Sequence, residues 1–133
     1  SIVKLLPEKA GEPQLEVVAN KTTIDLDELE RMSGGDTKFF NEMLRIFIRS
    51  SEEALMKFQQ DFQSSDWKAM AETAHKLAAP TKHLHATTLY EYLKKLENST
   101  ENTEPAELKK LVGLIEHELN CINTLLKQKL KEE

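Results

Sequence analysis

The sequence predicts an all-α protein, an antiparallel up-down four-helix bundle with one short extra helix on its N-terminal side. Apolar residues recur at spacings of three and four through most of the 133 residues, the period of a helix buried along one face. Glycine and proline number four each, and long helices tolerate little of either. No segment shows the apolar–polar alternation that is typical of a strand. Short connections between four long helices favour antiparallel neighbours.

The chain divides into a linker and one helical domain. Residues 1–22 contain Pro7, Gly11 and Pro13 and show no sustained period, so we interpret them as a linker from an upstream domain. Residues 23–131 carry enough apolar side chains for a single core. Because the chain begins at Ser1, we expect it to be part of a larger protein.

The short extra helix is expected over about residues 26–32. Asp25 and Glu28 have the spacing of a capping box, and the run from Ser33 to Gly35 stops the helix. Asp36 then caps a long second helix that reaches about residue 62. The apolar positions of this second helix are Phe40, Met43, Leu44, Phe47, Ala54, Leu55, Phe58 and Phe62.

A third helix begins after Asp66, its predicted cap. Its inner stripe consists of Trp67, Met70, Ala71, Ala74, Leu77, Ala78, Thr81 and Leu84. Pro80 lies inside this pattern, and its ring crowds the carbonyl of Lys76 and offers that carbonyl no N–H. We therefore predict a kink or local widening at Pro80; the alternative is that Pro80 marks an early helix end.

Two further helices complete the bundle. The fourth is expected from near Thr88, which has the spacing of a capping box with Glu91, and residues 97–104 are expected to form a loop. Pro105 suits the first turn of the fifth helix. The inward positions of the two helices are Leu89, Leu93, Leu96, Leu108, Leu111, Val112, Ile115, Leu119, Ile122, Leu125 and Leu126.

Composition argues against several classes of function. The formal net charge is -5 and no basic stripe is visible, which disfavours nucleic-acid binding. No apolar run approaches the ~20 residues that span a bilayer, so we expect no membrane contact by this domain. The four histidines lack the spacing of a metal site, and we expect no metal or cofactor to be bound. One cysteine and no signal pattern favour the cytoplasm.

His75 is the residue best placed for chemistry. At roughly 100° per residue, it lies to the side of the third helix's inner stripe, on an exposed flank. Imidazole, with an ordinary pKa of ~6.5, is a good nucleophile near neutral pH. Lys68, Glu72, Ala79 and Lys82 fall on the same side, so a small neighbour and cations are expected near the ring. Spacing alone leaves open that His75 is an ordinary solvated side chain.

The wider pattern resembles the histidine-containing phosphotransfer (HPt) family. The residues that carry the resemblance are Ala74-His75-Lys76-Leu77, Ala78-Ala79, Leu84-His85-Ala86, Leu89, Leu93 and Leu96-Glu97, preceded by Asp66-Trp67 and the long second helix. The resemblance covers roughly residues 24–130 and depends on the order of these pieces rather than on one position. The arrangement is similar to HPt domains at the C-terminal end of hybrid sensor kinases.

The resemblance implies a phosphorelay intermediate rather than an enzyme with its own ATP site. His75 would accept a phosphoryl group from, and donate it to, the aspartate of response-regulator receiver domains. The receiver, possibly in the same chain, would bring the Mg²⁺ ion. Four long helices can close a monomeric bundle, so we expect a monomer.

Three positions depart from the family pattern. The family's lysine three residues after the histidine is Ala78 here, its glycine at the next position is Ala79, and its glycine at the helix end is His85. Histidine tolerates the left-handed conformation better than most residues. We hypothesise that Lys82, or Lys76 by a longer reach, supplies the missing charge beside His75.

Side chains off the inner stripes are candidates for receiver docking. We favour docking over core packing for Phe39 and Ile46, with Lys68 and Glu72 beside them as polar contacts.

Two other functions remain open. One is an adaptor bundle that binds a receiver domain without chemistry. The other is a histidine-kinase dimerisation fragment, because His75 and Pro80 have the spacing of its phosphoacceptor box. Lys76, however, replaces the acidic residue of that box, and the sequence contains no glycine-rich nucleotide-binding segment.

Overall fold

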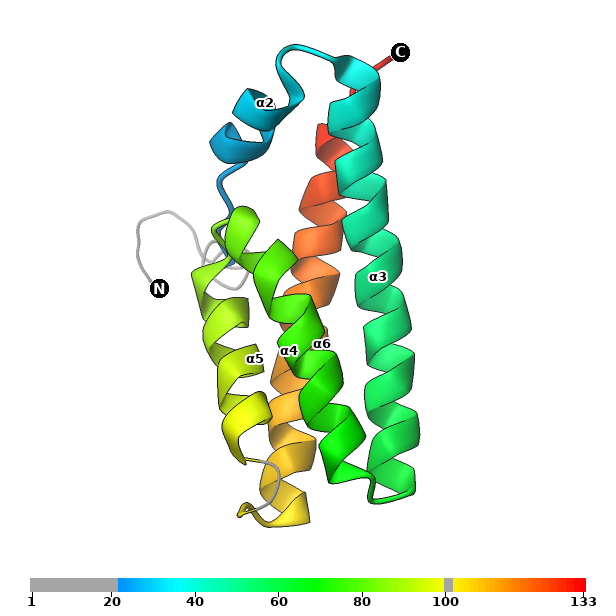
Figure 1. Cartoon of the computed structure of the whole chain (residues 1–133), viewed down its shortest axis with the longest axis vertical. Coiled ribbons are helices and arrows are strands. Elements are labelled where there is room, and N and C mark those ends of the chain that lie inside the picture. Colours follow the sequence, from blue (N-terminus) through cyan, green and yellow to red (C-terminus); the bar gives the residue numbers. More distant parts are fainter. Residues whose placement is uncertain (1–21, 100–101) are drawn as a thin grey trace, which may run out of the picture.

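The computed structural model describes residues 22–99 and 102–133, and within them the protein is all-helical (Figure 1). The helices are α2 (Asp27–Ser33), α3 (Thr37–Gln63), α4 (Trp67–His83), α5 (Thr87–Ser99) and α6 (Pro105–Lys129). The predicted all-α class is confirmed. Residues 1–21 of the predicted linker lie outside the described residues.

The four long helices form a closed ring of neighbours. α3 packs on α4, α4 on α5, α5 on α6, and α6 returns to α3, while α2 lies against α3 at one end of the bundle (Figure 1). The fully buried side chains at the centre include Phe40, Leu44, Phe58, Met70, Leu89, Leu93, Leu96, Leu108, Ile115, Leu119, Ile122 and Leu126. Among the described helices, none is both long enough and apolar enough to cross a membrane.

Aspartates cap α3 and α4. The Asp36 carboxylate accepts a hydrogen bond from the Phe39 N–H at 3.1 Å, and Asp66 accepts one from the Ala69 N–H at 3.1 Å. Both caps were predicted from the sequence, since a side-chain oxygen at this position satisfies an N–H that has no partner in the first helical turn.

Two predicted capping boxes are wrong. Glu28 does not cap α2, because its carboxylate bonds to His83 and His85 instead. Asp25 accepts a hydrogen bond from the Asp27 N–H at 2.9 Å, which is a turn contact before the helix. α5 begins at Thr87, so Thr88 lies inside the helix rather than at its cap.

The loop predicted over residues 97–104 starts too early, because α5 continues to Ser99. Buried Leu96 and the contacts of Glu97 with neighbouring side chains hold the last turn in helical form. Tertiary packing therefore overrides the polar composition of this segment.

The turn after α4 uses the left-handed residue that the sequence predicted. His85 has a φ of 56°, its N–H donates to the Lys82 carbonyl at 2.9 Å, and the Ala86 N–H donates to the Thr81 carbonyl at 3.4 Å. This pair of bonds is a Schellman motif, which usually has glycine at the left-handed position. The turn aims α5 back along α4.

Pro80 does not end α4, which continues without a break to His83. The alternative of an early helix end is therefore wrong, while the kink stays a prediction. Buried Thr81 donates its hydroxyl to the Leu77 carbonyl at 2.8 Å, and Leu84 is buried beyond it. These contacts anchor the last turn on the core despite the missing N–H of Pro80.

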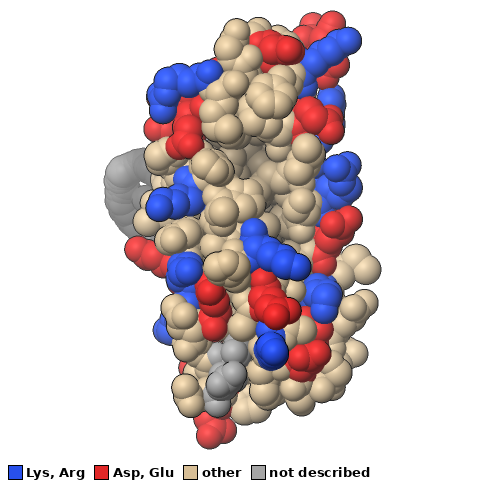
Figure 2. All heavy atoms as spheres, viewed as in Figure 1, with Lys and Arg blue, Asp and Glu red and all other residues tan. Residues whose placement is uncertain are grey.

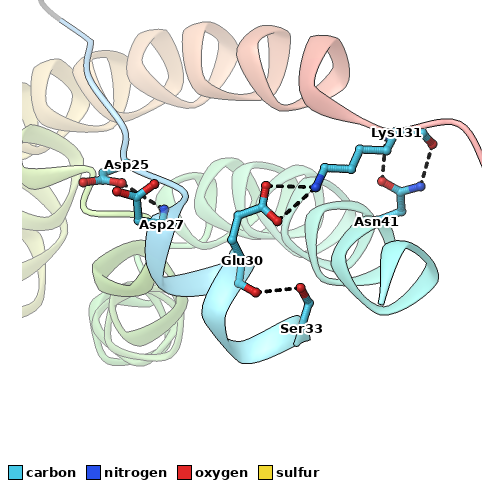
Figure 3. A network of polar contacts seen from close by, with 6 residues as sticks. All are labelled: Asp25, Asp27, Glu30, Ser33, Asn41 and Lys131. Atoms are coloured by element: carbon cyan, nitrogen blue, oxygen red, sulfur yellow. Dashed lines mark hydrogen bonds and ion pairs between the residues drawn. The ribbon is translucent and has the colours of Figure 1, made fainter. Parts of the chain in front are cut away.

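A polar network fixes α2 and the segment after α6 on the start of α3 (Figure 3). The Asn41 amide donates to the Lys131 carbonyl at 2.7 Å and accepts from the Lys131 N–H at 2.8 Å. The Lys131 ammonium reaches the Glu30 carboxylate at 2.9 Å. Since α2 has a single well-buried apolar side chain, Leu29, these contacts are a substantial part of what positions it.

Candidate functional site

His75 projects from the middle of α4 into solvent. The nearby residues Ala74 and Leu77 belong to the inner stripe of α4 and are buried, whereas the His75 side chain is 68% exposed. The helix period thus places the ring on the flank of the bundle, as the sequence predicted. A rigid, well-packed helix presents an accessible imidazole.

Glu97 on α5 orients this imidazole. The Nδ1 atom of His75 lies 2.8 Å from Oε2 of Glu97. The hydrogen bond from Lys94 and then that from His75 hold the pKa of the Glu97 carboxyl below its ordinary value, although desolvation acts in the opposite direction. An ionised carboxylate can only accept, so Nδ1 carries the proton and donates it. The Nε2 lone pair of the neutral ring is then left for chemistry.

The second oxygen of Glu97 is held by Lys94, one turn earlier on α5. Lys94 Nζ donates to Oε1 at 2.9 Å, and this bond raises the pKa of the Lys94 ammonium above its ordinary value. The sequence pattern included Glu97 but gave it no role beside His75, and it did not single out Lys94. The spacing of Lys94 and Glu97 fits a helical ion pair, but nothing in it tells which residue of α4 they face.

An open cleft of about 770 Å³ lies between α4 and α5 around the ring. It is lined by Lys68, Ala71, Glu72, His75, Lys76, Glu97, Asn98 and Asn102. The structure therefore brings three of the predicted polar neighbours, Lys68, Glu72 and Lys76, to the same cleft as His75.

Lys82 does not line this cleft. It shares a different hollow with Glu28 and His83, and its ammonium lies 5.9 Å from the centre of the Tyr90 ring. Lys82 does face the same side of α4 as His75, but two turns separate them by ~10 Å along the axis. Of the two lysines proposed to supply charge, the one that lines the cleft is Lys76.

The position of the family's missing lysine faces the core. Ala78 is 6% exposed, whereas Ala79, the small neighbour one turn from His75, is exposed. Ala78 therefore packs in the bundle and does not reach the cleft. A cation for this site must come from other positions.

A second, mostly apolar groove is formed by residues of α2, α3 and the end of α4. Phe39 and Ile46 are both exposed, as predicted, and Ile46 lines an apolar groove with Met32, Met43, Pro80 and others. Figure 2 shows a hollowed, uncharged region in the upper half of the molecule, with charged side chains around its edges and below it. Phe39 is not among the residues that line the groove.

Within the described residues, no group of three or more His, Cys, Asp or Glu side chains is arranged to hold a metal ion. The chemistry that the site itself offers is that of an exposed nucleophilic imidazole with an anionic partner. This combination on a four-helix bundle is the arrangement expected of a phosphoryl-carrier domain.

The chain belongs to the Hpt domain family, whose sequence model matches residues 42–129. It is similar in structure to histidine-containing phosphotransfer protein B (HptB) from Pseudomonas aeruginosa PAO1, with 26% identity and a TM-score of 0.72, over 80% of this chain and 92% of that one. It shares its fold with the HPT domain of a sensor hybrid histidine kinase from Shewanella, with 21% identity and a TM-score of 0.66, over the same shares. A comparison with curated proteins finds no significant match.

The protein acts in histidine phosphotransfer within a two-component phosphorelay. Domains of this family carry a phosphoryl group rather than catalyse a reaction on a substrate of their own, and they interact with response-regulator receiver domains.

Proposed function

We propose that His75 is the residue that accepts and donates the phosphoryl group, and that it reacts through Nε2. The observation that carries this proposal is an accessible ring whose Nδ1 is engaged by Glu97 at 2.8 Å. His75 also lies within the matched residues 42–129.

In the accepting step, the Nε2 lone pair attacks the phosphorus of the receiver's aspartyl phosphate. The N–P bond forms as the bond between phosphorus and the aspartyl oxygen breaks, and the aspartate leaves as a carboxylate with that electron pair. The proton stays on Nδ1, so the ring gains positive charge. The Glu97 carboxylate stabilises that charge, as the buried aspartate does in a Ser-His-Asp triad. Donation is the reverse of this step.

Cations around the cleft offset the charge of the phosphoryl group. Lys68 and Lys76 both line the cleft, and each could reach a phosphoryl oxygen on His75 with a charge-assisted hydrogen bond. A contribution from Lys82 would require its side chain to leave the Tyr90 ring.

The partner is a receiver domain that docks across α2, α3 and α4. Its aspartate would enter the cleft, accompanied by the Mg²⁺ ion that the receiver holds. Phe39 and Ile46 would supply apolar contact, and Lys68 and Glu72 would supply polar contact at the cleft itself. Transient partners commonly use an exposed apolar patch of this kind.

We further propose that the domain is a monomer in the cytoplasm and part of a larger hybrid kinase. The closed ring of four helices supports a monomer, since each long helix buries its apolar face within the chain. The linker-like composition of residues 1–22 supports an upstream domain, which could be the receiver itself.

Transfer from a phosphorylated receiver tests the assignment. We expect acid-labile label on the wild type and on His117→Gln, which removes an exposed imidazole on α6, but none on His75→Gln. ³¹P–¹⁵N correlation would place the phosphorus on Nε2. Binding of the receiver without label on any variant would instead support the adaptor function, and label on His75→Gln would show that another residue accepts the group.

A further inference from the structure

Lys94 takes no part in the proposed transfer step, yet one carboxylate, that of Glu97, connects it to the His75 ring. Its Nζ lies 2.9 Å from Oε1 of Glu97, whose Oε2 lies 2.8 Å from Nδ1 of His75. Lys94 does not line the cleft around His75. It therefore acts on the ring through Glu97.

We propose that Lys94 is a positioning residue for phosphotransfer, which holds the Glu97 carboxylate turned toward His75 so that Nε2 remains the nucleophile. This inference rests on the proposed role of His75 as phosphoacceptor.

Lys94 fixes the orientation of the Glu97 carboxylate. A glutamate side chain has three rotatable bonds, and one hydrogen bond to an exposed imidazole would hold it only weakly. Lys94 lies one turn before Glu97 on the same helix, and its bond to Oε1 holds the carboxylate oxygen that His75 does not engage. With both oxygens engaged, the carboxylate forms a bridge between α5 and the ring on α4.

Lys94 also affects whether the Glu97 carboxyl carries a proton. The Glu97 side chain is only 22% exposed, and desolvation by itself raises the pKa of its carboxyl. A protonated Glu97 could donate to Nδ1 instead of accepting from it. Nδ1 would then be the lone-pair nitrogen and Nε2 would carry the proton, which is the wrong tautomer for attack. The hydrogen bond from Lys94 is the largest influence that opposes this outcome.

Lys94 also affects the balance of charge around the phosphorylated His75 ring. The phosphoryl group brings negative charge into a cleft that already contains Glu97 and Glu72, with Lys68 and Lys76 as the cations that line it. Lys94 neutralises the carboxylate closest to the ring.

The test combines a direct readout of the His75 tautomer with transfer kinetics. Ring ¹⁵N shifts of His75 would be followed against pH in the wild type, in Lys94→Met, in the charge-retaining Lys94→Arg, and in Lys95→Met. Lys95 is the matched control, because it is the next residue on α5 and is exposed. The pH series also covers titration of Glu97, Glu72 and the cleft lysines.

We expect the wild type, Lys94→Arg and Lys95→Met to keep the proton on Nδ1. Lys94→Met should show a larger share of the Nε2–H tautomer and a transfer rate roughly tenfold lower, the low end of what an outer-shell partner of a histidine contributes. Its affinity for the receiver should be unchanged. A folded Lys94→Met with the wild-type shifts and rate would overturn the proposal, as would an equal effect in Lys95→Met.

The two proposals can fail separately. If the wild type were never labelled on His75, the phosphoacceptor assignment would fail, while the tautomer measurement would still show whether Lys94 positions the ring.

Discussion

The carboxylate of Glu97 lies 2.8 Å from Nδ1 of His75, so a side chain on α5 engages one of the two ring nitrogens of the α4 histidine. The two residues come from helices joined by a tight turn that contains the left-handed His85. The reactive group and its partner are thus positioned by the same helix pair.

Removing the Glu97 carboxylate should slow phosphotransfer. For Glu97→Ala we expect a rate roughly 10- to 100-fold lower, because Nδ1 loses its acceptor and the ring loses its orientation. The transfer rate of Glu97→Gln should lie between those of Glu97→Ala and the wild type, since its amide oxygen can still accept the hydrogen bond from Nδ1. The measurement is the single-turnover rate from a phosphorylated receiver, with Glu91→Ala on the exposed side of α5 as control. Equal rates in Glu97→Ala and the wild type would contradict the assignment.

The contact that holds α2 on the α4–α5 turn should weaken in acid. Glu28 accepts from His83 at 2.7 Å and from His85 at 3.1 Å, and these bonds hold its pKa below the ordinary value of 4.5. The unfolded chain therefore binds the proton more readily, and stability from this group is present above pH 4.5 and is lost as pH falls through the lower, folded-state value.

Thermal unfolding as a function of pH measures this effect. Glu28→Gln should show a smaller loss of melting temperature below pH 4.5 than the wild type. Glu52→Gln, at an exposed position of α3, should keep the wild-type profile. If the melting temperature fell equally below pH 4.5 in Glu28→Gln and in the wild type, the contact of Glu28 with His83 and His85 would not contribute to stability.

The turn between α3 and α4 offers a way to stabilise the bundle. Ser65 is exposed and has a φ of 56°, a conformation that costs side chains with a Cβ up to about 1 kcal/mol more than glycine. Ser65→Gly should therefore raise the free energy of unfolding in urea. Gln59→Gly, at an exposed position one turn before the end of α3, should lower it by up to about 1 kcal/mol. A loss of stability in both variants would contradict the strain at Ser65.

Receiver binding should depend on Ile46 but not on another exposed apolar residue of the same helix. Ile46 is 44% exposed and lines the apolar groove, whereas Met56 on the same helix is 62% exposed and lies outside it. Ile46→Lys should weaken the Kd for the receiver about tenfold, equivalent to about 1.4 kcal/mol, with the melting temperature preserved. Met56→Lys should bind normally. Comparable losses in both variants would place the docking surface elsewhere.

Local chemistry was enough to predict much of this molecule. Asp36 and Asp66 cap helices because their carboxylates satisfy adjacent N–H groups, and the period of α4 turns His75 outward while Ala74 and Leu77 turn inward. Each of these features depends on residues within about one turn of one another, so the chain pattern alone specifies it.

The partners of the reactive ring depend on how helices pack. Glu97 and Lys94 meet His75 because α5 returns along α4 in one register, and that register is chosen by the fit of buried leucines rather than by any polar spacing. The same packing extends α5 to Ser99 and turns Glu28 toward His83 instead of its own helix end. The sequence shows which chemical group each side chain carries. Which atom of another helix that group contacts depends on the packing of the core, because the whole fold minimises its exposed apolar surface.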